Sequence, residues 1–126
     1  MQAAISGNGK FFLGTDSAPH VAGKKIASCG CAGIFSSPLA IPLLIQLFEK
    51  HNSLEKIDPF TSRNGRAFYG LKQHKDMVRY VKKSKSIEVI KDIKTSDGKI
   101  TVFNPYGEIY WEKENYFSFV RKNEHK

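Results

Sequence analysis

The chain has 126 residues, and 20 lysines and arginines against 12 aspartates and glutamates give it a formal net charge of +8. Its 40% hydrophobic and 25% charged residues are typical of a soluble domain, and no apolar run of about 18 residues indicates a transmembrane helix. Two cysteines separated by one residue are a poor basis for a disulfide-rich scaffold.

The N-terminal residues are predicted to run from the end of a helix into a strand. Residues 2–6 have the pattern of a helix end, and Gly7-Asn8-Gly9 is typical of residues that terminate one. An apolar run then predicts a strand over residues 10–15, ending at Asp16. Because ligands lie at the carboxyl ends of strands in parallel α/β sheets and barrels, Asp16 followed by His20 predicts a chemical site. An aspartate after a strand is often only a turn former or a helix N-cap, and the spacing alone favours that interpretation over a catalytic one.

A loop is predicted over residues 16–35, with small residues at its centre in Ser28-Cys29-Gly30-Cys31-Ala32-Gly33. Such a segment lets a ligand approach the backbone closely. Cys29 and Cys31 could belong to a soft metal site or be free thiols. A structural zinc needs four ligands and the sequence has no second cysteine pair, which favours free thiols. Reduced thiols without a secretory signal predict a cytoplasmic protein.

Three helical segments are predicted next. They cover residues 37–51, residues near 54–57, and residues from Pro59 to about 68, where Gly70 would end the last one. The first is expected to have Ser37 as its N-cap and Pro38 at its first helical position. Its apolar side chains are expected to form an exposed patch unless the C-terminal part of the chain folds over them: Leu39, Leu43, Leu44, Leu47 and Phe48.

Beyond residue 71 the apolar residues alternate with period two, which predicts a β-rich extension over residues 72–126. Strands are expected at residues 78–81, 87–90, 100–103 and 108–112, with a hairpin turn at 96–99. Four apolar residues near the end are expected to dock a last turn: Tyr116, Phe117, Phe119 and Val120.

Three segments of the sequence resemble dihydroorotases, in particular the shorter bacterial class (class II) of these metal-dependent amidohydrolases. They are residues 13–20 (LGTDSAPH), 28–33 (SCGCAG) and 64–71 (NGRAFYGL). The resemblance implies an α/β fold. Residues 1–71 would be the C-terminal portion of a (β/α)8 TIM barrel, with its last strand, active-site loop and helices. Residues 72–126 would be a small β-rich extension.

The resemblance also implies a role for four residues. Asp16 matches the aspartate that ligates one of two zinc ions and takes the proton from the hydroxide bridging them. His20 matches the histidine that binds the substrate carboxylate, and Ala32 matches the alanine whose backbone N–H contributes to the same anion site. Ala18 lies with its backbone near the substrate. The implied reaction interconverts N-carbamoyl-aspartate and dihydroorotate, a small-molecule substrate pair of pyrimidine biosynthesis.

The sequence departs from the family in its metal ligands. The family needs a His-x-His pair, a carboxylated lysine and two further histidines, whereas His51, His74 and His125 form no such pair and fit solvated positions. One carboxylate cannot hold two zinc ions, and a whole barrel takes about 250 residues. We therefore expect a C-terminal fragment of a dihydroorotase that needs the missing N-terminal barrel portion and is inactive alone.

The alternative is a non-catalytic remnant that acts as a binding or self-associating module. Either way the isolated chain is expected to be oligomeric, partly molten or insoluble, because surfaces built to face the missing portion would be exposed. An upstream reading frame encoding a His-x-His pair would distinguish the two.

Basic residues are concentrated in the second half of the chain, which raises the question of nucleic-acid binding. Acidic residues are scattered among them, and lysine outnumbers arginine, a composition that favours a solvated face over a surface that reads bases. We therefore expect neither a nucleic acid nor a membrane as a partner.

Overall fold

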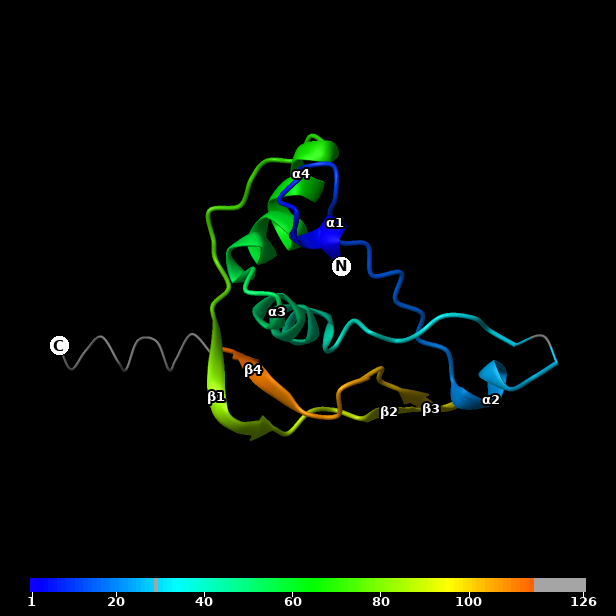
Figure 1. Cartoon of the computed structure of the whole chain (residues 1–126). Coiled ribbons are helices and arrows are strands. Elements are labelled where there is room, and N and C mark those ends of the chain that lie inside the picture. The colour runs from blue at the N-terminus through cyan, green and yellow to red at the C-terminus, as the bar shows by residue number, and fades with distance from the viewer. Residues whose placement is uncertain (29, 115–126) are drawn as a thin grey trace.

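The structure is a computed structural model that describes residues 1–28 and 30–114 (Figure 1). In chain order its elements are α1 (Gln2–Ile5), α2 (Ala22–Lys25), α3 (Ala40–Lys50), η1 (Leu54–Lys56), η2 (Pro59–Arg63), α4 (Asn64–Phe68), β1 (Tyr80–Ile87), β2 (Asp92–Thr95), β3 (Gly98–Thr101) and β4 (Ile109–Lys113). Among the described residues, every helix is too short or too polar to cross a bilayer.

Helix α3 lies at the centre, with α1, η1, η2 and α4 on one side of it and β4 on the other, whereas α2 lies beside β3 (Figure 1). Phe48 is fully buried, and its ring centroid lies 5.5 Å from that of Phe60 in η2. On the opposite side, Leu43 belongs to a buried cluster with Val102 and Ile109 from the C-terminal half. The C-terminal half therefore folds over the helix and covers the apolar face that would otherwise be exposed.

Helix α3 begins later than the sequence indicated. Its N-cap is Leu39, not Ser37, and the Leu39 N–H donates to the Ser36 carbonyl across a turn, at 3.0 Å. Ser37 is held elsewhere, since its N–H donates to Ser17 Oγ at 3.1 Å. Pro42 falls in the first turn of α3, where a backbone N–H has no partner within the helix, so proline is tolerated there.

The strand expected over residues 10–15 is absent, because residues 11–20 form neither helix nor strand. A strand needs a continuous backbone partner, and this segment has isolated contacts instead. The Leu13 N–H donates to the Phe60 carbonyl at 2.9 Å, and Asn64 Nδ2 donates to the Phe11 carbonyl at 3.0 Å. The Phe12 ring packs on that of Phe68, with centroids 5.2 Å apart.

Two small antiparallel sheets form the C-terminal half. Strands β2 and β3 make a hairpin at the expected turn, with Thr95 opposite Gly98, but β2 was not predicted and β3 begins two residues before the expected strand at 100–103. Strand β1 pairs with β4, and the register shifts between Lys82 and Ile87. The expected strands at 78–81 and 87–90 are thus replaced by one strand across the polar residues between them. The side chains of β1 do not alternate between buried and exposed, so the alternation of apolar residues in the sequence could not predict this strand. It is defined by its backbone pairing with β4.

Helix α2 forms inside the loop expected over residues 16–35, so that prediction is wrong there, while the other short helices follow the sequence closely. Helix α1 ends before Gly7, which has φ +72°, and α4 ends before Gly70, which has φ +65°. Pro59 begins η2, and η1 lies where a short helix was expected. Cys29 and the expected docking of the four apolar residues between 116 and 120 lie outside the described residues.

Candidate functional site

The predicted site residues lie on two loop segments, residues 16–20 and 30–36, that cross between α3 and α2 (Figure 1), and this contact is called the crossing. The Ala18 N–H donates to the Ile34 carbonyl at 2.8 Å. Beside this bond, Gly33 approaches so closely that a Cβ added to it would lie 2.6 Å from the Ala18 Cβ. Residues 32–34 are therefore in contact with the segment that follows Asp16, although the two are distant in sequence.

Gly33→Ala is expected to separate these two segments and to destabilise the protein by about 1–3 kcal/mol. Gly33 has φ +93°, a conformation that L side chains rarely adopt, and the added methyl group would overlap the Ala18 side chain. Gly14→Ala is the control, because a Cβ there meets nothing within 4 Å. Urea unfolding of both variants tests this, and equal midpoints would contradict it.

Two side chains that sequence reasoning missed, those of Ser17 and Lys25, connect the two segments at the crossing. Ser17 Oγ accepts the backbone N–H groups of Ser36, at 3.2 Å, and of Ser37, at 3.1 Å. The Lys25 ammonium donates to the Gly33 carbonyl from α2. The pattern of serines and lysines gave no signal for these contacts, because each joins residues 8 to 20 positions apart.

Asp16 is exposed and has φ +43°, so it lies in a left-handed turn rather than at the end of a strand. Its predicted position at a strand end is therefore wrong. Aspartate tolerates this conformation better than most residues, so a turn role accounts for Asp16 as well as a chemical one does. The exposed carboxylate is nevertheless available to a ligand or to another polypeptide segment.

His20 and Ala32 flank the crossing. His20 is half-buried, and its backbone N–H donates to the Ala18 carbonyl at 3.0 Å in a tight turn that leads into α2. Ala32 is exposed, and its neighbour Gly33 contacts Ala18. The crossing therefore brings the backbone near Ala32 to the backbone around Ala18. A shared anion site of His20 and Ala32 stays a prediction.

The described residues do not fit a zinc pair by themselves. They contain no group of three or more His, Cys, Asp or Glu side chains that could hold a metal ion. Asp16 could supply one oxygen ligand, but two zinc ions need a much larger donor set. A complete metal site would require side chains from another polypeptide segment.

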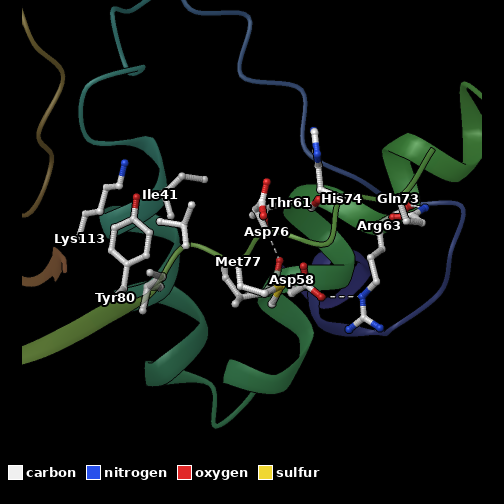
Figure 2. A pocket seen from close by; sticks show the side chains of 14 residues that line it. Ile41, Asp58, Thr61, Arg63, Gln73, His74, Asp76, Met77, Tyr80 and Lys113 are labelled. Atoms are coloured by element: carbon white, nitrogen blue, oxygen red, sulfur yellow. Dashed lines mark hydrogen bonds and ion pairs between the residues drawn. The ribbon is translucent and has the colours of Figure 1, made fainter. Parts of the chain in front are cut away.

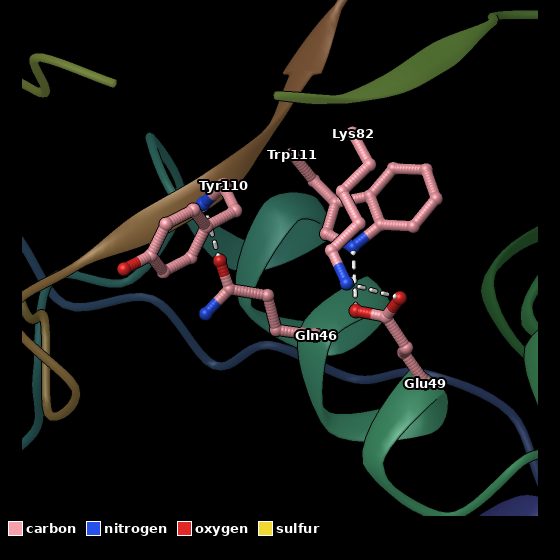
Figure 3. Close-up of polar contacts among 5 residues, drawn as sticks. All are labelled: Gln46, Glu49, Lys82, Tyr110 and Trp111. Atoms are coloured by element: carbon pink, nitrogen blue, oxygen red, sulfur yellow. Dashed lines mark hydrogen bonds and ion pairs between the residues drawn. The ribbon is translucent and has the colours of Figure 1, made fainter. Parts of the chain in front are cut away.

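A second polar cluster fixes the C-terminal half on α3 (Figure 3). Gln46 Oε1 accepts the Tyr110 N–H at 2.6 Å. One Glu49 oxygen accepts from Lys82 Nζ at 2.8 Å and the other from Trp111 Nε1 at 3.1 Å. The hydrogen bonds from Lys82 and Trp111 lower the pKa of the Glu49 carboxyl below 4.5. These contacts stabilise the position of β4 on the helix.

Glu49→Gln is expected to lower the free energy of unfolding at neutral pH by up to about 1 kcal/mol. The effect is small because the Lys82 side chain that pairs with Glu49 is exposed to solvent. Because the folded-state pKa is lowered, the ionised carboxylate stabilises the fold above the unfolded-state pKa, and this contribution is lost as pH falls below about 4.5. The difference in unfolding free energy between parent and variant should therefore shrink from pH 6 to pH 3. Glu55→Gln is the control, because Glu55 forms an ion pair with Lys56 that is exposed to solvent. A difference independent of pH would contradict this role.

No protein-family model matches the chain. Curated relatives named dihydroorotase are similar to most of it. That of Ruegeria sp. (strain TM1040) is 43% identical over 87% of the chain, and that of Chelativorans sp. (strain BNC1) is 42% identical over 90%. The chain spans 32% and 33% of the length of these two relatives.

Solved structures give the same result. The dihydroorotase of Saccharomyces cerevisiae in complex with 5-fluoroorotic acid is 32% identical, with a TM-score of 0.76. The dihydroorotase of Campylobacter jejuni is 28% identical, with a TM-score of 0.70. Each match covers 90% of this chain and 32% of the solved chain. The resemblance carried by residues 13–20, 28–33 and 64–71 is thus confirmed, and the chain is similar over most of its length to the C-terminal part, about one third, of dihydroorotases.

Proposed function

We propose that this chain supplies the C-terminal part of a dihydroorotase, a cyclic amidohydrolase that interconverts N-carbamoyl-aspartate and dihydroorotate, and that it is inactive alone. The observation that carries the proposal is the 43% identity over 87% of the chain, confined to 32% of the relative's length. In the complete protein this chain would form the end of a (β/α)8 barrel over residues 1–71 and a β-rich extension over 72–126. The expected location is the cytoplasm.

Within that protein, Asp16 would supply one carboxylate to the zinc pair, and His20 with the backbone of Ala32 would bind the substrate carboxylate. The contact of Ala18 with Ile34 and Gly33 supports this assignment, because it draws the two loop segments together. An exposed Asp16 next to that crossing is accessible to a segment contributing the remaining ligands. The partners are then the small-molecule substrate and the N-terminal barrel portion.

Reconstitution tests the proposal. The N-terminal two thirds of the Ruegeria relative, truncated where similarity to this chain begins, would be co-expressed with the chain and assayed for dihydroorotate hydrolysis. Turnover is expected from the pair and from neither part alone. His20→Ala in this chain should raise the KM for dihydroorotate more than it lowers kcat, because the residue binds the substrate's carboxylate. Stable co-purification of an inactive pair would contradict the proposal.

Self-association is a second candidate function, favoured by one exposed aromatic surface. Phe68 is 70% exposed and Tyr69 66% exposed at the end of α4, and the adjacent Leu71 is 54% exposed. Contiguous exposed apolar side chains of this kind are typical of surfaces that bind a partner. Without the N-terminal portion, a second copy of the chain is the available partner.

The isolated chain is therefore expected to form oligomers, and Phe68→Ser should shift it toward the monomer. Light scattering coupled to size-exclusion chromatography measures the mass, and thermal melting measures cooperativity. Ile26→Ser is the matched control, since Ile26 is 88% exposed but lies near α2, away from this surface. A strict monomer with a sharp two-state melt at high concentration would show that the chain is an independent domain.

A further inference from the structure

Ala32, whose backbone N–H is expected to bind the substrate carboxylate, lies between two residues that α2 holds. The Cys31 N–H donates to the Lys24 carbonyl at 3.2 Å. The Gly33 carbonyl accepts a hydrogen bond from the Lys25 ammonium. The Ala32 N–H itself makes no hydrogen bond to any of the described residues. The two contacts therefore fix the backbone on either side of Ala32 and leave its N–H available to an anion.

Helix α2 also connects this segment to His20, the other residue expected to bind the carboxylate. The N–H groups of Lys24 and Lys25 donate to the Val21 carbonyl at 3.0 and 3.4 Å, so the helix is a single closed turn. His20 directly precedes Val21, and both lysines lie at the other end of the turn. A side chain at that end can therefore set the position of Ala32 relative to His20.

The two lysines of α2 contribute in different ways. Lys24 provides its backbone carbonyl, while its side chain is exposed and has no hydrogen bond or ion pair among the described residues. Lys25 is half-buried, and its side chain reaches Gly33, eight residues later. A hydrogen bond from an ammonium is stronger than one between neutral groups. Lys25 is therefore the side chain of α2 that holds the segment containing Ala32.

The charges at the crossing suit an anion better than those of a cavity of about 450 Å3 between α3, η2 and the segment leading into β1 (Figure 2). Two carboxylates and three basic side chains line that cavity: Asp58, Asp76, Arg63, His74 and Lys113. Asp58 and Arg63 form an ion pair of 2.5 Å, which neutralises the guanidinium. Residues 16–36 contain one carboxylate and two lysines, and neither lysine pairs with a carboxylate of the described residues.

We propose that Lys25 is a positioning residue for the substrate carboxylate. Its ammonium holds the Gly33 carbonyl, and this contact places the Ala32 N–H where it and His20 bind the same anion. Lys25 itself does not touch the substrate. This role rests on the proposed function and names the side chain that sets its substrate site. Without the ammonium, the segment around Ala32 shifts and the substrate binds more weakly, while the chemistry at Asp16 is unchanged.

Kinetics of the pair reconstituted with the N-terminal portion of the Ruegeria relative test this role. Lys25→Met removes the ammonium but keeps an unbranched side chain. It is expected to raise the KM for dihydroorotate about tenfold and to change kcat less than about twofold, because the lost interaction binds ground state and transition state equally. Lys25→Arg should restore most of the parent KM, since a guanidinium can donate to the same carbonyl.

Lys24→Met is the matched control, because it removes the same charge one residue away and keeps the backbone carbonyl. Its KM is expected to equal that of the parent pair. A parent pair that turns over with a KM unaffected by Lys25→Met would overturn the role of Lys25 alone. A parent pair without turnover would overturn the proposed function and the role of Lys25 with it.

The Cys31 thiol provides a second readout that needs no turnover. Cys31 is a half-buried free thiol in the segment that Lys25 holds. In the same pair carrying Cys29→Ser, alkylation of Cys31 by iodoacetamide would be followed by mass spectrometry. Lys25→Met is expected to raise the rate about threefold over Lys24→Met, because the released segment opens more often. Both variants lose one positive charge, so their effects on the thiolate fraction are matched. Equal rates would mean that Lys25 acts through its charge and would overturn the positioning role.

Discussion

The purified 126-residue chain is expected to show no dihydroorotate hydrolysis and to retain no tight pair of zinc ions after dialysis. The described residues contain no group of three metal-ligating side chains, and one carboxylate at Asp16 cannot replace a bimetal ligand set. The chain also spans 32% of the length of its Ruegeria relative, so most of that enzyme has no counterpart here. Ring hydrolysis with added zinc, together with metal analysis after dialysis, provides the measurement.

The control is Asp16→Ala in two settings. In the isolated chain it should change neither turnover nor bound zinc, because the described residues contain no group that could hold a metal ion. In the pair reconstituted with the N-terminal portion it should abolish turnover, a loss of at least about 100-fold if the carboxylate both ligates and accepts a proton. Turnover by the isolated chain that disappears in Asp16→Ala would show that it builds an active site unaided.

Phe48→Ala is expected to remove a large part of the free energy of unfolding. Phe48 is fully buried on α3, and its ring packs against that of Phe60 at 5.5 Å. Truncating a buried phenylalanine costs about 3–5 kcal/mol, whereas a small domain has a total stability of about 5–15 kcal/mol. Urea unfolding followed by circular dichroism measures the loss.

Phe103→Ala is the matched control for Phe48→Ala. It removes the same atoms from a side chain that is 38% exposed, so less apolar surface returns to water. Its backbone bond to the Phe35 carbonyl, at 2.8 Å, does not depend on the side chain. A loss below about 1.5 kcal/mol is expected. Equal losses in the two variants would mean that Phe48 does not anchor the core.

Local signals in the sequence predicted the hairpin turn and the short helices other than α2. Glycines mark the ends of α1 and α4 because Gly7 and Gly70 adopt positive φ values that other residues rarely reach. Pro59 begins η2 because its missing N–H costs nothing in a first turn. Glycine and proline act on the backbone within a few residues of their own position, so the sequence around them is sufficient to predict where a helix begins or ends.

Elements defined by distant partners were predicted poorly. The apolar run at residues 10–15 looked like a strand, but the described structure gives it no neighbouring backbone ladder. Strand β1 crosses a polar run because β4, more than twenty residues later, pairs with its backbone. Helix α3 loses its expected first turn because Ser17 binds the N–H of Ser37. In each case a contact between distant residues outweighs the local pattern.

The sequence by itself determined the relationship to dihydroorotases and the residues that carry it, because residues 13–20, 28–33 and 64–71 are contiguous patterns of residue types. It also showed that these 126 residues contain no His-x-His pair, because residue types and their spacing can be read directly from a sequence. Only the tertiary structure decided how the two loop segments meet. Their meeting depends on the Ala18–Ile34 hydrogen bond, on Ser17 and on the close approach of Gly33. Such contacts join residues 15 to 20 positions apart, and serines, glycines and backbone groups occur throughout the chain, so residue types alone could not reveal which of them meet.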